Sequence, residues 1–191
     1  MRAALVAKIF IMFLLPAYAQ SLPDQAACLA CHGENGQSQR PEVPSLGAQP
    51  EYYVTIQLVM FRDKLRAVDV MNEALAGASD DSVRVLARFV SKLPAPAPAP
   101  EPVPDASDAA RIERAEMLAR KNHCIICHKP DFSGGHSVPR LAGQREDYLV
   151  KALRGYKDNS RRGYDASMAD VIEPLSDEQI LDMAYYLARV R

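Results

Sequence analysis

The sequence predicts an all-α protein made of two tandem small domains. Apolar residues recur at helical spacing in several segments, and no segment shows the alternation typical of a strand. A pattern of cysteine, histidine, proline, glutamine and methionine occurs twice, with an offset of 95 residues between Pro44 and Pro139 and of 97 between Met71 and Met168. A proline-rich stretch separates the two copies. The chain's 191 residues are enough for two such domains.

Residues 1–19 are predicted to be a signal peptide. Arg2 and Lys8 give a basic start to a short apolar run. Ala17 and Ala19 then provide the small residues of a cleavage site. An uncleaved membrane anchor is the alternative, but the run is short of the ~20 residues that a spanning helix needs. The mature protein is therefore expected to be exported to the periplasm.

Two amphipathic helices are predicted in the first domain, residues 20–93. One is expected over 50–64, where Pro50 takes the first helical position and apolar residues follow at helical spacing. The other is expected over 80–92, with one apolar face and acidic residues in its first turn, where the helix dipole favours them.

Residues 94–104 are predicted to be a linker. Proline occupies every second position, which excludes an α-helix or a central strand and favours the extended polyproline conformation. Such a segment is a semi-rigid spacer that reaches roughly 30 Å when straight, at ~3.1 Å per residue.

Three helices are predicted in the second domain, residues 105–191. They are expected over 108–121, 145–157 and 177–189. In the first of these, Ile112, Met117 and Leu118 are expected to face inward. Ser176 and Gln179 have capping-box spacing at the start of the last one. Domains of this size have marginal cores, so a large buried cofactor would help to stabilise them.

All four cysteines fall in two Cys-x-x-Cys-His motifs. The motif residues are Cys28, Cys31 and His32 in the first domain and Cys124, Cys127 and His128 in the second. This spacing places two thiols one helical turn apart, where they can form thioether bonds to the vinyl groups of one haem while the histidine binds its iron. A redox disulfide or half of a zinc site is the alternative, but neither accounts for a histidine after both pairs. The predicted cofactor is therefore haem c, two per chain and covalently attached.

Met71 and Met168 are the predicted sixth ligands of the two irons. Each stands eight residues before the Ser-Asp pair that opens the last helix of its domain, in a predicted loop over the haem face. A methionine ligand raises the potential of the iron, which suits electron transfer. Met60, Met117 and Met183 lie within amphipathic helices and are expected in the core, with Met60 as the alternative ligand in the first domain.

Other polar residues near the motifs have weaker interpretations. His136 has no counterpart in the first half and is expected in a surface loop rather than on the iron. His123, next to Cys124, is expected near a haem without binding it. Arg161 and Arg162 are interpreted either as partners of haem propionates or as a solvated charge pair.

Together these motifs resemble the dihaem c-type cytochromes of the cytochrome c4 family. The resemblance rests on the double Cys-x-x-Cys-His, on the Pro-x-Leu-x-x-Gln segments that begin at Pro44 and Pro139, on the aromatic-bearing middle helix and on the late methionine. It implies two tandem class I cytochrome c domains, each wrapped around one covalently bound haem. It also implies that the carbonyl groups of Pro44 and Pro139 orient the rings of His32 and His128.

The resemblance further implies a periplasmic electron-transfer protein of a respiratory chain rather than an enzyme. Its expected partners are redox proteins: a quinol-oxidising cytochrome complex, a terminal oxidase or a dehydrogenase. Peripheral association with a membrane is compatible with this role, and the formal net charge of −1 gives no sign of a nucleic-acid partner. The alternative is an electron-transfer subunit of a periplasmic dehydrogenase. A catalytic dihaem enzyme is disfavoured, because all cysteines serve attachment and both halves offer a methionine.

Overall fold

The computed structural model describes residues 24–100, 106–161 and 166–191. Across these ranges the regular structure is helical, without strands. None of their helices combines the length and the apolar character needed to span a membrane. The predicted signal peptide, residues 1–19, lies outside the described residues.

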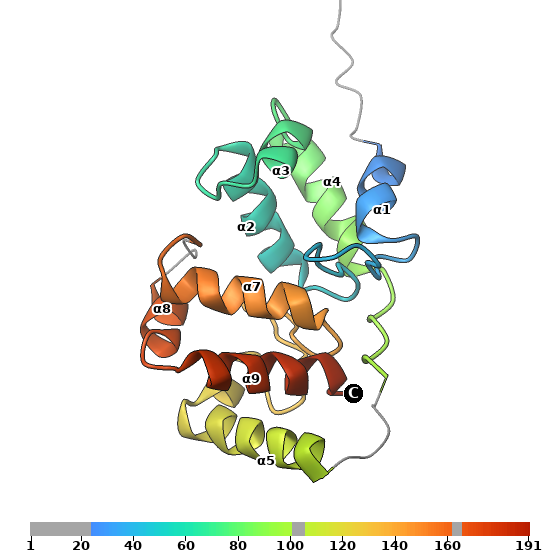
Figure 1. Ribbon diagram of the computed structural model, residues 1–191. Coiled ribbons are helices and arrows are strands. Elements are labelled where there is room, and N and C mark those ends of the chain that lie inside the picture. Colours follow the sequence, from blue (N-terminus) through green and yellow to red (C-terminus); the bar gives the residue numbers. More distant parts are fainter. Residues whose placement is uncertain (1–23, 101–105, 162–165) are drawn as a thin grey trace, which may run out of the picture.

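The first four helices form one group, drawn from blue to green in Figure 1. They are α1 (Gln25–His32), α2 (Glu51–Arg62), α3 (Asp69–Ala74) and α4 (Asp80–Ser91). Helix α2 packs along α4, and α3 contacts α2. Pro50 is the N-cap of α2 rather than its first residue, and Ser79 caps α4 by accepting a hydrogen bond from the amide of Ser82.

The remaining helices form a second group. They are α5 (Ala106–Lys121), α6 (Cys124–His128), α7 (Glu146–Lys157), α8 (Ser167–Ile172) and α9 (Asp177–Arg189). Helix α9 lies between α5 and α7 and packs against both (Figure 1). The predicted capping box of Ser176 and Gln179 is present at the start of α9.

Helix α5 buries a different face from the one that the sequence suggested. Met117 was expected inside, but 52% of its surface is exposed, so this prediction is wrong. The buried positions are Ala115 and Ala119, exposed by 0% and 2%. Their small side chains let α5 approach α9 closely. Leu118 packs against the core as expected.

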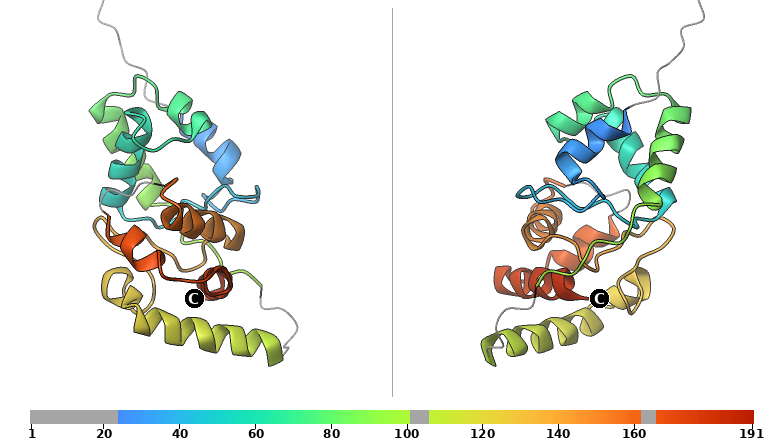
Figure 2. Two further views of the ribbon diagram at one scale, coloured as in Figure 1. Left: turned by 60° about the vertical axis from the view of Figure 1, so that its left-hand side comes forward. Right: turned by 90° about the vertical axis from the view of Figure 1, so that its right-hand side faces the viewer.

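The linker lies along both helical groups over its described part, residues 94–100 (Figure 2). The amide of Ala99 donates to the carbonyl of Ala188 at 2.8 Å, and the amide of Ala48 donates to the carbonyl of Leu93 at 2.9 Å. Gly47 permits this approach, because a Cβ atom there would collide with the carbonyl of Pro94. This part of the linker is therefore packed against the domains rather than held straight in solvent.

Candidate functional site

The motif histidine of each half is buried and held by a proline carbonyl. His32, exposed by 7%, donates from Nδ1 to the carbonyl oxygen of Pro44 at 2.8 Å. His128, exposed by 4%, does the same with Pro139 at 3.0 Å. Because a carbonyl oxygen only accepts, the proton must sit on Nδ1, which leaves the lone pair on Nε2. The parts of the chain that the structure describes give neither Nε2 a hydrogen bond, so both are available to a metal.

The buried environment of both imidazoles favours their neutral form. Burial lowers the pKa of His32, and the hydrogen bond to Pro44 offsets only part of this effect. Burial likewise lowers the pKa of His128, against the opposing effect of Pro139. A neutral ring with a fixed tautomer is the form that binds iron.

The cysteines stand on the same short helices as these histidines. Cys28 and Cys31 belong to α1, and Cys124 and Cys127 to α6, and all four thiols are free. Burial raises the pKa of Cys28 and of Cys124. A redox-active Cys-x-x-Cys pair needs the opposite, a thiol with a lowered pKa, so the environment disfavours the disulfide alternative.

Met71 lies in the short helix α3 rather than in a loop. It packs on an apolar cluster of Phe61, Leu75 and Leu86, against which Cys28 also packs. The next residue, Asn72, is buried and fastens this segment, because its side-chain amide donates to the carbonyl of Phe61 at 2.6 Å. The structure thus brings one end of the Cys-x-x-Cys-His motif and the predicted methionine ligand to the same core.

Met168 repeats this arrangement in the second half. It lies in α8, and it packs with Cys124 on the main apolar cluster of that half. The alternative ligand in the first half, Met60, is buried at 7% exposure, and its sulfur accepts from the side chain of Gln57 at 3.9 Å. Met60 and Met183 are therefore core residues, as expected.

Comparisons with known proteins agree with this duplicated arrangement. A cytochrome c family model matches residues 112–191. A thiosulfate dehydrogenase electron acceptor from Thiomonas intermedia (strain K12) is 33% identical over 178 residues, which cover 90% of this chain and 82% of the relative. A cytochrome c4 from Thiocapsa roseopersicina is 30% identical over 171 residues, covering 84% of this chain and 85% of the relative. The chain belongs to the cytochrome c4 family.

Comparison with a solved cytochrome c4 structure confirms the fold of this chain. The reduced recombinant cytochrome c4 from Pseudomonas stutzeri superposes with a TM-score of 0.77 at 26% identity, covering 87% of this chain and 94% of that one. The chain is thus an all-α protein of two class I cytochrome c domains, and it is an electron-transfer cytochrome with covalently bound haem c. The two motifs agree with two haems per chain.

A cationic cluster at the boundary between the domains fits the acidic groups of haem. Arg66 from the first domain and Arg161 from the second both donate to the hydroxyl of Tyr148, at 3.2 and 2.9 Å. Burial opposes ionisation of Tyr148, but the two guanidinium groups outweigh it and lower its pKa to about 7. Two guanidinium groups that converge in this way are also the donors that carboxylates such as haem propionates take. Arg162, the other predicted partner, lies outside the described residues.

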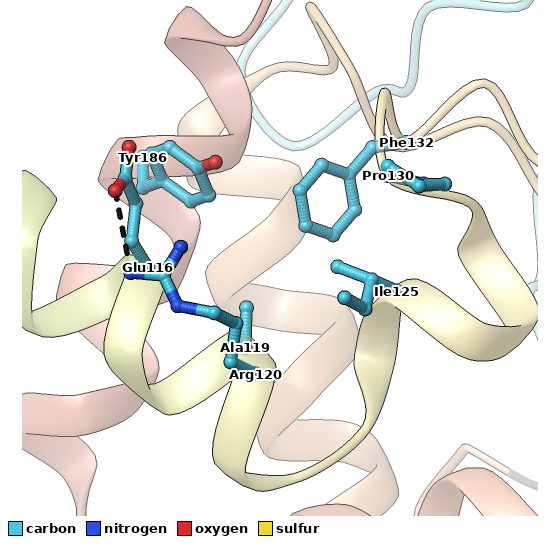
Figure 3. Close-up of a pocket in the computed structure, with 7 residues that line it drawn as sticks. All are labelled: Glu116, Ala119, Arg120, Ile125, Pro130, Phe132 and Tyr186. Atoms are coloured by element: carbon cyan, nitrogen blue, oxygen red, sulfur yellow. Dashed lines mark ion pairs between the residues drawn. The ribbon is translucent and has the colours of Figure 1, made fainter.

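One small hollow in the second domain is not a substrate site. It has a volume of about 140 Å³ and lies between α5, α6 and α9, beside Phe132 and Tyr186 (Figure 3). The two rings meet edge to face with centroids 5.8 Å apart, and Glu116 and Arg120 form an ion pair at its rim. Ligand pockets usually measure ~300–1,000 Å³, so this hollow is too small for one.

Sequence reasoning missed the residues that join the two domains. His136 lies in an exposed turn, as expected, and its ring also packs against Tyr52 with centroids 4.3 Å apart, while its carbonyl accepts from the amide of Tyr53 at 3.0 Å. Gln49 and Gln144 also reach across the boundary. The only signal in the sequence was that both glutamines stand at the same place in their Pro-x-Leu-x-x-Gln segments, which does not by itself identify their partners.

Proposed function

We propose that the protein is a periplasmic dihaem electron carrier with one haem c in each domain. The observation that carries this proposal is the duplicated arrangement of a buried, proline-held histidine with a Cys-x-x-Cys pair and a methionine on one apolar core. The proposed domains are residues 20–93 and 105–191, with 94–104 as the linker and 1–19 as a signal peptide that directs export.

The proposal assigns each motif residue a role. Cys28, Cys31, Cys124 and Cys127 would hold the two haems as thioethers. His32 and His128 would bind the irons through Nε2, and Met71 and Met168 would be the opposite ligands. Haem iron supplies reversible one-electron chemistry when bound. The residues around it would tune its potential and exclude water, and a histidine and a methionine together would leave no position on the iron for a substrate, so we propose a carrier and not an enzyme.

A second candidate is an electron-accepting subunit of a periplasmic dehydrogenase. The similarity to a protein named as the electron acceptor of thiosulfate dehydrogenase favours it. In either case a dehydrogenase or a quinol-oxidising cytochrome complex would be the donor and a terminal oxidase the acceptor. Peripheral contact with a membrane would suffice for these exchanges.

The haem content of the purified protein tests the proposal directly. We expect two haems per polypeptide in a pyridine haemochrome assay, both retained after acid-acetone extraction, and two one-electron waves in an optical potentiometric experiment. One haem per chain, or extractable haem, would contradict it. A dehydrogenase that co-purifies with the chain in a fixed ratio would favour the subunit over the free carrier.

A further inference from the structure

Each domain reaches into the other with one glutamine. Gln144 accepts from the amide of Ser45 at 2.8 Å through Oε1, and its Nε2 donates to the carbonyl of Ser45 at 2.8 Å. Gln49 makes the same exchange with Arg140, at 3.0 and 2.9 Å. Both glutamines are buried, at 4% and 7% exposure. We call these four bonds the glutamine clamp, and the loops that carry them meet at the boundary between the domains (Figure 2).

The amide that each glutamine contacts belongs to a particular peptide group. The N–H of Ser45 shares its peptide group with the carbonyl of Pro44, which accepts the proton of His32. The N–H of Arg140 likewise shares its peptide group with the carbonyl of Pro139, which accepts from His128. A continuous chain of hydrogen bonds therefore runs from the glutamine of one domain to the histidine of the other.

Hydrogen bonds in such a chain strengthen one another. When an acceptor binds the N–H of a peptide group, it polarises the carbonyl of the same group, by an estimated ~10–30% per bond. A stronger acceptor on Nδ1–H makes the imidazole a better electron donor at Nε2. Burial of the clamp preserves this effect, because little water competes with it.

We propose that Gln49 and Gln144 are positioning residues that tune the haem site of the opposite domain, Gln144 through His32 and Gln49 through His128. The proposal rests on the proposed ligation of iron by these histidines. The interface would then do more than hold the domains together. Docking of the domains would set how strongly both histidines donate electrons from Nε2 to iron. A separated domain would lose this tuning even if it kept its own haem.

The test replaces one glutamine at a time in the full holoprotein. In Gln144→Leu, the peptide carbonyl of Pro44 becomes a weaker acceptor and His32 a weaker donor to ferric iron, so the potential of the first haem should rise while that of the second stays unchanged. Gln49→Leu should give the reverse. The two potentials are followed separately through the haem methyl signals in NMR during a potentiometric experiment. Each variant is the control for the other.

A second pair of variants distinguishes an effect of the hydrogen-bond chain on the haem potential from an effect of weaker contact between the domains. Gln144→Glu keeps an acceptor for the amide of Ser45 and should keep the first potential near or below its original value. Lys151→Ala removes an exposed ion pair between the domains, Lys151 to Glu42 at 2.8 Å, which has no link to either histidine. It should shift neither potential.

Hydrogen exchange gives a readout that does not depend on the iron. The amide of Ser45 should exchange on the order of tenfold faster in Gln144→Leu, the size expected for one lost hydrogen bond, and near its original rate in Gln144→Glu. A shift of the haem in the substituted domain itself, equal shifts of both haems, or no shift would each overturn the proposal. The proposed function would still stand in those cases, because two haems would still be counted.

Discussion

The two domains share one plan but differ in how their cores are built. In the second domain, twelve of the described buried residues form a single cluster that α5, α7 and α9 share. In the first domain, the described residues form two smaller clusters of three buried residues, one around Val54 and one around Phe61, and the partly buried Leu58 packs against both. Helix α5 has no counterpart among the described residues of the first domain, where α1 begins only three residues before Cys28.

This difference indicates that the first domain depends more on its cofactor. A small domain has little apolar surface to bury, and the clusters of the first domain hold fewer buried residues than the single cluster of the second. A haem covalently held at α1 would supply the missing apolar surface. The second domain has its own continuous core and needs this contribution less.

Removal of haem attachment from one domain at a time should show the largest effect. We expect Cys28→Ala with Cys31→Ala to abolish most amide protection in α2 and α4, because the two small clusters cannot hold them alone. The matching change, Cys124→Ala with Cys127→Ala, should leave α5 and α9 largely protected. Hydrogen exchange with mass spectrometry measures both. Equal loss in the two variants would remove the distinction between the domains.

Replacement of the methionines tests whether the two sites are chemically alike. Met71→Ala and Met168→Ala should each lower the potential of their own haem by more than ~59 mV, a tenfold change for a one-electron couple, because an electron-withdrawing ligand is lost. The weak near-red absorption of the sulfur–iron bond should disappear for that haem. Met60→Leu serves as the control. Loss of the band in Met60→Leu but not in Met71→Ala would show that the ligand was misassigned.

The helices were predictable from the sequence where their signals are local. The limits of α9 were predicted because Ser176 and Gln179 form a cap within four residues of chain. The helices that hold Met71 and Met168 were missed, since six residues are too few to show a periodic pattern. Met117 was misplaced because the pattern weighs large apolar residues, whereas alanines make the contact of α5 with α9.

The candidate site likewise has a part that the sequence predicts and a part that it does not. The Cys-x-x-Cys-His motif is contiguous, so its chemistry is visible in the sequence. The roles of Gln49, Gln144 and His136 depend on how two domains dock, and no spacing within one domain encodes that docking. Their partners stand 91 residues away for Gln49 and 99 for Gln144.

An acidic residue found only in the second domain offers a test by pH. Asp182 is buried, at 8% side-chain exposure, and accepts from Arg111 and Arg114 at 2.9 and 2.8 Å. At the matching position of α4, 97 residues earlier, the first domain has the partly exposed Val85. Burial would raise the pKa of Asp182, but the hydrogen bonds from Arg114 and Arg111 outweigh it, and the pKa is lowered.

Because the folded pKa is lowered, the stabilisation is complete above the unfolded value of ~3.9 and is lost as pH falls through the folded value. We expect Asp182→Asn to weaken the packing of α5 on α9 by ~1–3 kcal/mol at neutral pH. The stability of this packing should then change less as the pH falls. Amide exchange in α5 as a function of pH measures both, with α4 as the internal reference. An unchanged acid dependence would rule out this role for Asp182.

The smallest expected effect concerns one strained backbone position of the first domain. Lys64 has φ 57°, and the matching residue of the second domain, Asn159, has φ 59°. Asparagine tolerates this left-handed conformation better than lysine does. Lys64→Asn should therefore raise the free energy of unfolding by ~0.5–1 kcal/mol, measured by urea denaturation. A neutral or destabilising result would mean that the lysine side chain has a compensating contact.

The glutamine clamp also makes the contact between the two domains nearly symmetric. The same residue type makes the same exchange in both directions, as across the two-fold axis of a homodimer with isologous contacts. The side chain of each glutamine forms its hydrogen bonds with main-chain atoms, so these bonds do not require particular side chains at Ser45 and Arg140, which differ. The linker then brings the two domains close together, and the glutamine exchange orients them. A chain cut within the linker should reassemble from its halves, and each half carries both the glutamine and the main-chain groups needed for the same exchange with a copy of itself.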